Sequence, residues 1–300
     1  MRSIVRLSIA LLLTVLVAAD EPTPPKQALC PECNGKAFTA DVGTCQGCGE
    51  TTSSGAFELC PKCAFAKGVC QACGKPLAGP EEFALETEDG WSLAATFTPH
   101  QGAEARGGVV LLHMLGRTRA DWAQLTPELA KAGLDVLAID FRGHGQSPAK
   151  PWKDFTDAEF QGLIVDAASA VKALRARPSV ADKPVLLIGG SIGANAAIRL
   201  AAQDPSIAGV VALSPGLDYH HVTTEDAMPG LGERPLLLAA SKDDEDSAQA
   251  VEKLASLAKG PKELIVYAKA GHGTDMFGKE DSPGALTQSI SAWIESVLPK

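Results

Sequence analysis

Aromatic residues and positive charge are both scarce in this sequence. Aromatic residues make up 5% of the chain against 45% hydrophobic residues in total, so we expect a core built from aliphatic side chains. Lysine and arginine number 27 against 36 acidic residues, which gives a net charge of −9. Binding to nucleic acid depends on a basic surface that this composition does not supply, so we expect no nucleic-acid partner.

Long hydrophobic runs are also missing. The apolar stretch at residues 7–17 follows a short basic start and is shorter than the roughly 20 residues that span a bilayer. Small residues precede Asp20, which is typical of a cleaved secretory signal. We expect a signal peptide at residues 1–19, a stiff linker at residues 20–27, and a secreted or periplasmic protein with no membrane association after cleavage. An uncleaved anchor is the alternative.

Cysteine is missing from the chain after residue 73, because all the cysteines lie in four C-x-x-C pairs within residues 28–79. Such pairs supply two thiolates from one tight turn, and eight thiolates match two tetrahedral zinc sites. We therefore predict a zinc-ribbon-like domain with two structural zinc ions and the ligands Cys30, Cys33, Cys45, Cys48, Cys60, Cys63, Cys70 and Cys73.

Three points about this segment stay open. Export favours disulfides, and a thioredoxin-like redox role is a weaker alternative because the βαβ context is missing. The ligand sets can be sequential, with the first two pairs at one site and the last two at the other, or interleaved. The segment can also serve as a docking module for a protein partner.

Residues 80–300 alternate between strand and helix patterns, which predicts an α/β domain with a doubly wound, mostly parallel sheet. A hairpin turning at Asp89 and Gly90 opens the domain. We expect an irregular stretch at 214–233, strands at 107–112, 134–140, 185–188, 209–213, 235–240 and 262–267, and helices at 122–132, 157–175, 246–258 and 283–297, with a further helix after residue 191.

A G-x-S-x-G motif lies between the strand at 185–188 and the helix that follows it, with Ser191 at its centre. The bare motif is common by chance, but a strand before it and a helix after it are typical of a nucleophile elbow. We predict Ser191 as an exposed nucleophile, and the amide of Ile192 as an oxyanion donor at the helix N-terminus.

A serine hydroxyl needs a base and an acid that orients the base. His272 lies between small residues after the last strand and is the candidate base. The acid must come from residues 243–246, which follow the strand at 235–240. The loop that starts at His113 leaves a strand beside the elbow and can supply a second oxyanion amide.

The motifs ETEDGWSL, LLHMLG, AIDFRGHGQS, IGGSIGAN, LLLAASKDDED and KAGHG appear in the order and spacing of the α/β-hydrolases. Over residues 83–298 the chain resembles this family, in particular its dienelactone-hydrolase-like and serine-aminopeptidase-like members. The resemblance implies the α/β-hydrolase fold, a Ser-His-Asp triad, a small-molecule ester substrate and no cofactor for catalysis.

The resemblance also assigns individual residues. It places the triad acid at Asp244, with Asp243 as the alternative. His113 is expected to order the oxyanion loop, above a structural ion pair between Asp140 and Arg142. Met114 stands where the family has glycine, so the second oxyanion amide can be that of Met114 or of Leu115.

Two other readings of the function remain. One is amide cleavage, as in aminopeptidase-like relatives, and the other is a zinc-ribbon binding protein on an inactive hydrolase fold. His220 and His221 lie in the irregular stretch where a lid would be inserted. We expect them at the rim of an open pocket rather than at a metal site.

Overall fold

The computed structural model describes residues 29–298, apart from residues 31–32, 34–35, 76, 78, 102–103, 148–149 and 280–283. The predicted signal peptide at residues 1–19 and the predicted linker at residues 20–27 lie outside the described residues. None of the helices within these described ranges is both long and apolar enough to cross a membrane.

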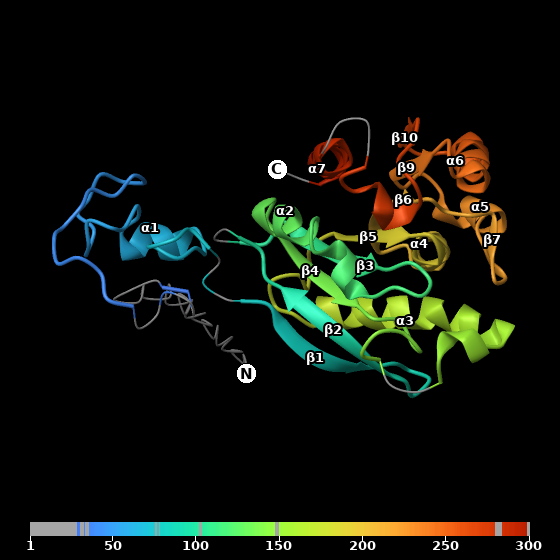
Figure 1. Cartoon of the computed structure of the whole chain (residues 1–300), viewed down its shortest axis with the longest axis horizontal. Coiled ribbons are helices and arrows are strands. Elements are labelled where there is room, and N and C mark those ends of the chain that lie inside the picture. The colour runs from blue at the N-terminus through green and yellow to red at the C-terminus, as the bar shows by residue number, and fades with distance from the viewer. Residues whose placement is uncertain are drawn as a thin grey trace, which may run out of the picture.

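An eight-stranded sheet forms the centre of the larger part of the protein, with the strand order β1-β2-β4-β3-β5-β6-β9-β10 (Figure 1). The pairings of β1 with β2 and of β2 with β4 are antiparallel, and all the others are parallel. The predicted doubly wound, mostly parallel sheet is therefore confirmed. Its strands are β1 (Glu81–Glu86), β2 (Ser92–Thr98), β3 (Gly107–Leu112), β4 (Leu134–Ile139), β5 (Val185–Gly190), β6 (Ile207–Leu213), β9 (Leu236–Ser241) and β10 (Lys262–Tyr267).

Helices cover both faces of the sheet and bury the residues of its central strands on both sides. Val110 of β3 faces the cluster formed with α3, α4 and α6, and Val109 faces the cluster formed with α2 and α7. Because side chains alternate along a strand, a strand buried on both faces must be apolar throughout. The helices are α2 (Thr126–Lys131), α3 (Asp157–Arg175), α4 (Ile192–Gln203), α6 (Glu245–Leu257) and α7 (Ala285–Val297).

Two predicted segments differ from the structure. The helix expected at 122–132 is divided into a 3-10 turn (Arg119–Trp122) and α2, because Pro127 lies in the first turn of α2 and a proline there starts a new helix. The stretch expected to be irregular contains β7 (Asp218–Tyr219), β8 (Val222–Thr223), a 3-10 turn (Glu225–Ala227) and α5 (Met228–Leu231). These elements are too short for a periodic pattern to reveal them.

The predicted ion pair between Asp140 and Arg142 is wrong. Asp140 instead binds the guanidinium of Arg119 and accepts a 2.7 Å hydrogen bond from the Arg119 amide. Arg142 turns toward α3, where its guanidinium lies 2.6 Å from the buried Asp166 and 2.7 Å from Asp89. Each charge finds a partner that is distant in sequence, which local spacing does not reveal.

The cysteine-rich segment contains one short helix, α1 (Pro61–Ala66), and an isolated bridge between Thr44 and Thr51. Most of the rest of its described chain is turns, bends and irregular backbone (Figure 1). Half of its buried residues are cysteines. In the described part of this segment the hydrophobic cluster is built on Cys30, Cys33 and Cys70, so apolar packing alone contributes little to holding the segment together.

Candidate active site and metal sites

The turn between β5 and α4 places Ser191 in a strained conformation, with φ 53° and ψ −123°. A β-carbon on Gly189 would lie 2.2 Å from the carbonyl oxygen of Gly193, and one on Gly193 would lie 2.3 Å from the carbonyl oxygen of Leu112. No side chain fits at either position, so the motif needs both glycines for the close approach of backbone segments. This geometry is that of a nucleophile elbow.

The surrounding backbone holds the strained turn in place. The Ser191 amide donates a 2.8 Å hydrogen bond to the carbonyl of Leu213 on the neighbouring β6, and its carbonyl accepts from Ala194 at 2.9 Å. A non-glycine residue at positive φ costs on the order of 1–3 kcal/mol and persists only where its surroundings determine it. Strain of this kind is common at active sites.

His272 lies beside the elbow, in the loop that follows β10. A β-carbon on the next residue, Gly273, would be 3.7 Å from the Ser191 nitrogen, which places this loop against the elbow. The Nδ1 atom of His272 is 2.7 Å from Oδ2 of Asp244, at the start of α6. A carboxylate at Nδ1 fixes the tautomer in which Nε2 can accept a proton.

Asp243 has a different position from Asp244. Its Oδ1 atom accepts a hydrogen bond from the Ser241 hydroxyl and another from the Gly271 amide at 3.1 Å. The Ser241 hydroxyl bond is the main reason why the pKa of Asp243 lies below its usual range. This carboxylate therefore ties the loop before His272 to the end of β9 and does not contact the imidazole.

Two buried serines that the sequence analysis did not single out hold the same loop. The Ser241 hydroxyl accepts a 2.7 Å hydrogen bond from the Ala270 amide, and the Ser214 hydroxyl accepts one of 2.8 Å from the Gly273 amide. Both serines are fully buried at the carboxyl ends of parallel strands. Serines are too common at strand ends for the sequence alone to reveal this role.

His113 is fully buried and orders the loop after β3. Its Nε2 atom accepts a 2.9 Å hydrogen bond from the Phe141 amide, and its Nδ1 atom lies 2.6 Å from the Met114 carbonyl. These contacts require a neutral ring with its proton on Nδ1. Burial, together with the nearby His144, lowers the pKa of His113 to about 3.

The side chain of Met114 packs below the elbow. Its sulfur accepts a 3.4 Å contact from the Thr274 amide and occupies the space where a β-carbon of Gly273 would lie. No protein acceptor among the described residues binds the amide N–H of Met114, Leu115 or Ile192. This leaves Met114 and Leu115 equal candidates for the second oxyanion amide.

The prediction that the nucleophile is exposed is wrong for this structure, because Ser191 is only 8% exposed. Tyr219 of β7 lies next to it. The Tyr219 ring packs edge-on against His272, with 6.3 Å between ring centroids, and its hydroxyl lies 3.1 Å from that of Ser247. Burial raises the pKa of Tyr219, whereas contact of the phenol with the Ser247 and Ser191 hydroxyls acts in the opposite direction.

The two histidines after Tyr219 lie on the outside of this hairpin. His220 stacks on Phe160 of α3 with ring centroids 4.1 Å apart, and the His221 Nε2 atom lies 3.4 Å from Asp157. Both adopt positive φ, which is uncommon outside glycine.

A large cavity of about 750 Å³ lies away from these histidines and from Ser191, between Cys30 and the β2-β4 part of the sheet.

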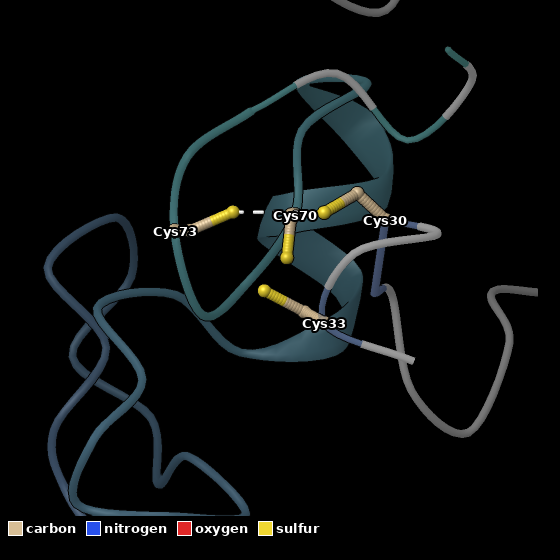
Figure 2. Close-up of side chains that lie close together, drawn as sticks. All are labelled: Cys30, Cys33, Cys70 and Cys73. Carbon is tan, nitrogen blue, oxygen red and sulfur yellow. Dashed lines mark hydrogen bonds between the residues drawn. The ribbon is translucent and has the colours of Figure 1, made fainter. Parts of the chain in front are cut away.

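The eight cysteines form two groups of four, and within each group the sulfur atoms lie within 4.8 Å of one another. The first C-x-x-C pair joins the fourth, and the second joins the third, so the sequential ligand sets are wrong and the sets are nested. Figure 2 shows the sulfur atoms of the outer group pointing toward one another. The groups are Cys30, Cys33, Cys70 and Cys73, and Cys45, Cys48, Cys60 and Cys63.

Sulfur spacing within the groups suits a metal ion. Cys30 and Cys73 have their sulfur atoms 3.6 Å apart, and Cys48 and Cys60 have theirs 3.7 Å apart. A tetrahedron with zinc–sulfur bonds of about 2.3 Å has edges of about 3.8 Å, whereas a disulfide is about 2.05 Å long. All eight thiols are free in this structure.

The turns around the cysteines have the geometry of metal-binding knuckles. Gly49 and Gly74, each directly after a C-x-x-C pair, adopt φ of 77° and 69°. The amides of Gly47 and Cys63 each point at a cysteine sulfur at 3.4 Å, and such contacts stabilise thiolates. Asn34 and Gly35, which follow the first pair, lie outside the described residues.

Solved structures with similar folds include an esterase and a dienelactone hydrolase. An esterase from Pyrococcus furiosus superposes with a TM-score of 0.59 and 21% identity, covering 73% of this chain and 92% of the esterase. A dienelactone hydrolase from Anabaena variabilis gives a TM-score of 0.58 and 21% identity over 74% of this chain and all of the hydrolase. The chain is an α/β-hydrolase by fold.

Sequence comparisons also find hydrolase relatives for part of this chain. The family described as serine aminopeptidase, S33, matches residues 103–232, which include Ser191 and the His113 loop but end before Asp244 and His272. An uncharacterized protein of Mycobacterium tuberculosis is 27% identical over 223 residues, or 68% of this chain and 76% of its own length. The family match supports a hydrolase, and the solved structures show that the chain shares their fold.

The buried neutral His113 predicts how stability depends on pH. Its pKa is about 3 in the folded protein against 6.5 for an ordinary histidine, so only the unfolded chain binds the proton between these values. The contribution of His113 to the free energy of unfolding is complete above pH 6.5 and declines as the pH falls toward 3. Between pH 6.5 and 4.5 we expect a loss of about 2–3 kcal/mol from this residue.

Urea unfolding of the wild type and of His113→Asn at several pH values measures this contribution. The asparagine variant is less stable at pH 7 but should show a shallower decline over this range, because it has no proton to take up. Parallel pH profiles for the two proteins would contradict the assignment.

Proposed function

We propose that this protein is an exported serine hydrolase that cleaves an ester or related acyl bond of a small molecule with the triad Ser191, His272 and Asp244. The observation that carries the proposal is the 2.7 Å contact between His272 Nδ1 and Asp244 in a loop packed against a strained Ser191. A strained serine beside a histidine that a carboxylate orients is the arrangement that activates a hydroxyl.

The chemistry follows from these positions. Ser191 Oγ attacks the carbonyl carbon of the substrate while His272 Nε2 takes its proton, and the Asp244 carboxylate stabilises the resulting imidazolium. The oxyanion binds the amide of Ile192 and that of Met114 or Leu115. The imidazolium then protonates the departing alcohol, and a water molecule, activated by the same histidine, releases the acid. No diffusible cofactor takes part.

The esterase and dienelactone hydrolase structures favour an ester as the substrate. Amide cleavage is the second candidate, because the matching family is described as a serine aminopeptidase. Hydrolysis of p-nitrophenyl acetate and of aminoacyl p-nitroanilides by one preparation compares the two directly.

Labelling with a fluorophosphonate tests the nucleophile. We expect the wild type to react and Ser191→Ala to be inert, with ester hydrolysis reduced to at most the roughly 10³–10⁴-fold over water that an oxyanion hole supplies alone. Ser256→Ala, which removes an exposed hydroxyl on α6, is the matched control and should label normally. A wild type that does not react supports the reading of a binding protein on an inactive fold.

Substitution of the two neighbouring carboxylates, Asp243 and Asp244, tests which of them is the triad acid. Asp244→Asn should lower kcat by a factor on the order of 10⁴, because an amide can hold the imidazole in the wrong tautomer. Asp243→Asn should cost far less, because the hydrogen bonds of Asp243 go to Ser241 and to the Gly271 amide rather than to the imidazole. Steady-state kinetics on p-nitrophenyl acetate compares them, and a larger loss in Asp243→Asn would move the acid by one residue.

For the cysteine-rich segment, predicted to span residues 28–79, we propose two structural zinc ions that take no part in the ester chemistry. Nested groups of free thiols with tetrahedral spacing support this assignment. Four thiolates per ion supply the stability that apolar packing alone does not give the segment. Export to a secreted or periplasmic location rests on residues 1–19, and a protein partner for the segment is a further part of the proposal.

Metal removal tests the zinc assignment. Elemental analysis of protein purified without added metal should give two zinc ions per chain, and a chelator should release both and unfold the segment. Ester hydrolysis should stay within about two-fold, because the triad needs no Lewis acid. A protein with neither zinc nor titratable thiols in denaturant would instead contain four disulfides.

A further inference from the structure

The catalytic groups proposed above differ in their access to solvent. The His272 side chain is 37% exposed, whereas Ser191 is only 8% exposed. The Tyr219 ring packs edge-on against the imidazole, with 6.3 Å between ring centroids, and its phenol is close enough to the Ser191 hydroxyl to affect the pKa of Tyr219. The imidazole is thus open to solvent where the serine is not, and Tyr219 lies close to both groups.

The Tyr219 ring occupies a place shaped to receive it. A β-carbon on Gly216 would lie 2.6 Å from the ring, so only glycine leaves room there. At the far end the phenol oxygen lies 3.1 Å from the hydroxyl of Ser247, which is fully buried on α6. The ring is thus held on its face by a glycine and at its tip by a buried hydrogen-bonding partner.

The hairpin that carries Tyr219 is fastened to the helix that begins at the nucleophile. The fully buried Asn195 of α4 accepts a 3.0 Å hydrogen bond from the Gly216 amide and donates one of 2.6 Å to the Val222 carbonyl. The hydroxyl of Thr224 donates to the Gly216 carbonyl at 2.8 Å. Both ends of the hairpin are therefore anchored, and Tyr219 is a fixed wall rather than the tip of a mobile lid.

We propose that Tyr219 limits the size of the acyl group that the enzyme accepts, an inference that rests on the proposed function. A carbonyl carbon bound to Ser191 Oγ has three other substituents. Its oxyanion faces the Ile192 amide, and its leaving oxygen faces His272, which opens to solvent. The acyl group takes the remaining direction, where Tyr219 closes the site, so acetyl and propionyl esters fit and long acyl chains do not.

The rates on p-nitrophenyl esters with acyl groups of different length test whether Tyr219 limits the acyl group. For the wild type, kcat/KM on p-nitrophenyl octanoate should be at most about a tenth of that on the acetate. Tyr219→Ala should raise the octanoate-to-acetate ratio by at least about ten-fold, since a few methylene groups in a hydrophobic pocket change discrimination by that order. Tyr219→Phe keeps the ring and should keep the ratio within about three-fold. Tyr219→Leu shortens the side chain, should raise the ratio by a smaller factor, and serves if the alanine variant unfolds.

Esters that differ only in their alcohol group serve as the control. Acetate esters of short and long alcohols should keep their relative kcat/KM in Tyr219→Ala, because the leaving group lies toward His272. An unchanged acyl ratio in an active variant, or a change on the alcohol side alone, would overturn the proposal. A wild type that neither turns over esters nor reacts with a fluorophosphonate would refute the proposed function itself, and this inference with it.

Discussion

The close approach of backbone at the elbow is the constraint on which the rest of the site depends. Gly193 lies so near the end of β3 that a β-carbon would be 2.3 Å from the Leu112 carbonyl oxygen. This contact joins the first turn of α4 to the strand that leads into the His113 loop. A single packing condition therefore sets the strained serine, the free amide after it and the loop that offers a second amide. A substitution at either glycine would disturb all three.

Hydroxyl groups at the ends of two strands hold the loop that carries His272. Ser214 and Ser241 each bind an amide of the loop around His272, so the imidazole is held by backbone contacts as well as by Asp244. A site that must keep its groups within about half an ångström of a working geometry needs such supporting contacts. The division of work between Asp243 and Asp244 has the same origin, because one carboxylate fastens the loop and the other faces the ring.

Local patterns predicted what local physics determines. The bounds of β3, α3 and β10 agree with the sequence-based expectation because apolar runs and the Thr156 cap define them. The elbow was predictable because its motif consists of five consecutive residues. Features that depend on contacts between distant residues were not predictable in this way. The partners of Asp140 and Arg142, the hydroxyls behind His272 and the burial of Ser191 all arise when segments far apart in the chain pack together.

The nested cysteine groups suggest an order of assembly that a sequential arrangement would not have. The inner group joins cysteines between residues 45 and 63, and the outer group joins residues 30–33 to 70–73. Closing a loop costs entropy that grows with its length. If both groups hold metal ions, as proposed above, binding at the inner group would fold the chain between the two outer pairs back on itself, so the outer site would close a shorter effective loop. We therefore expect the inner ion to bind first and the outer ion to leave first.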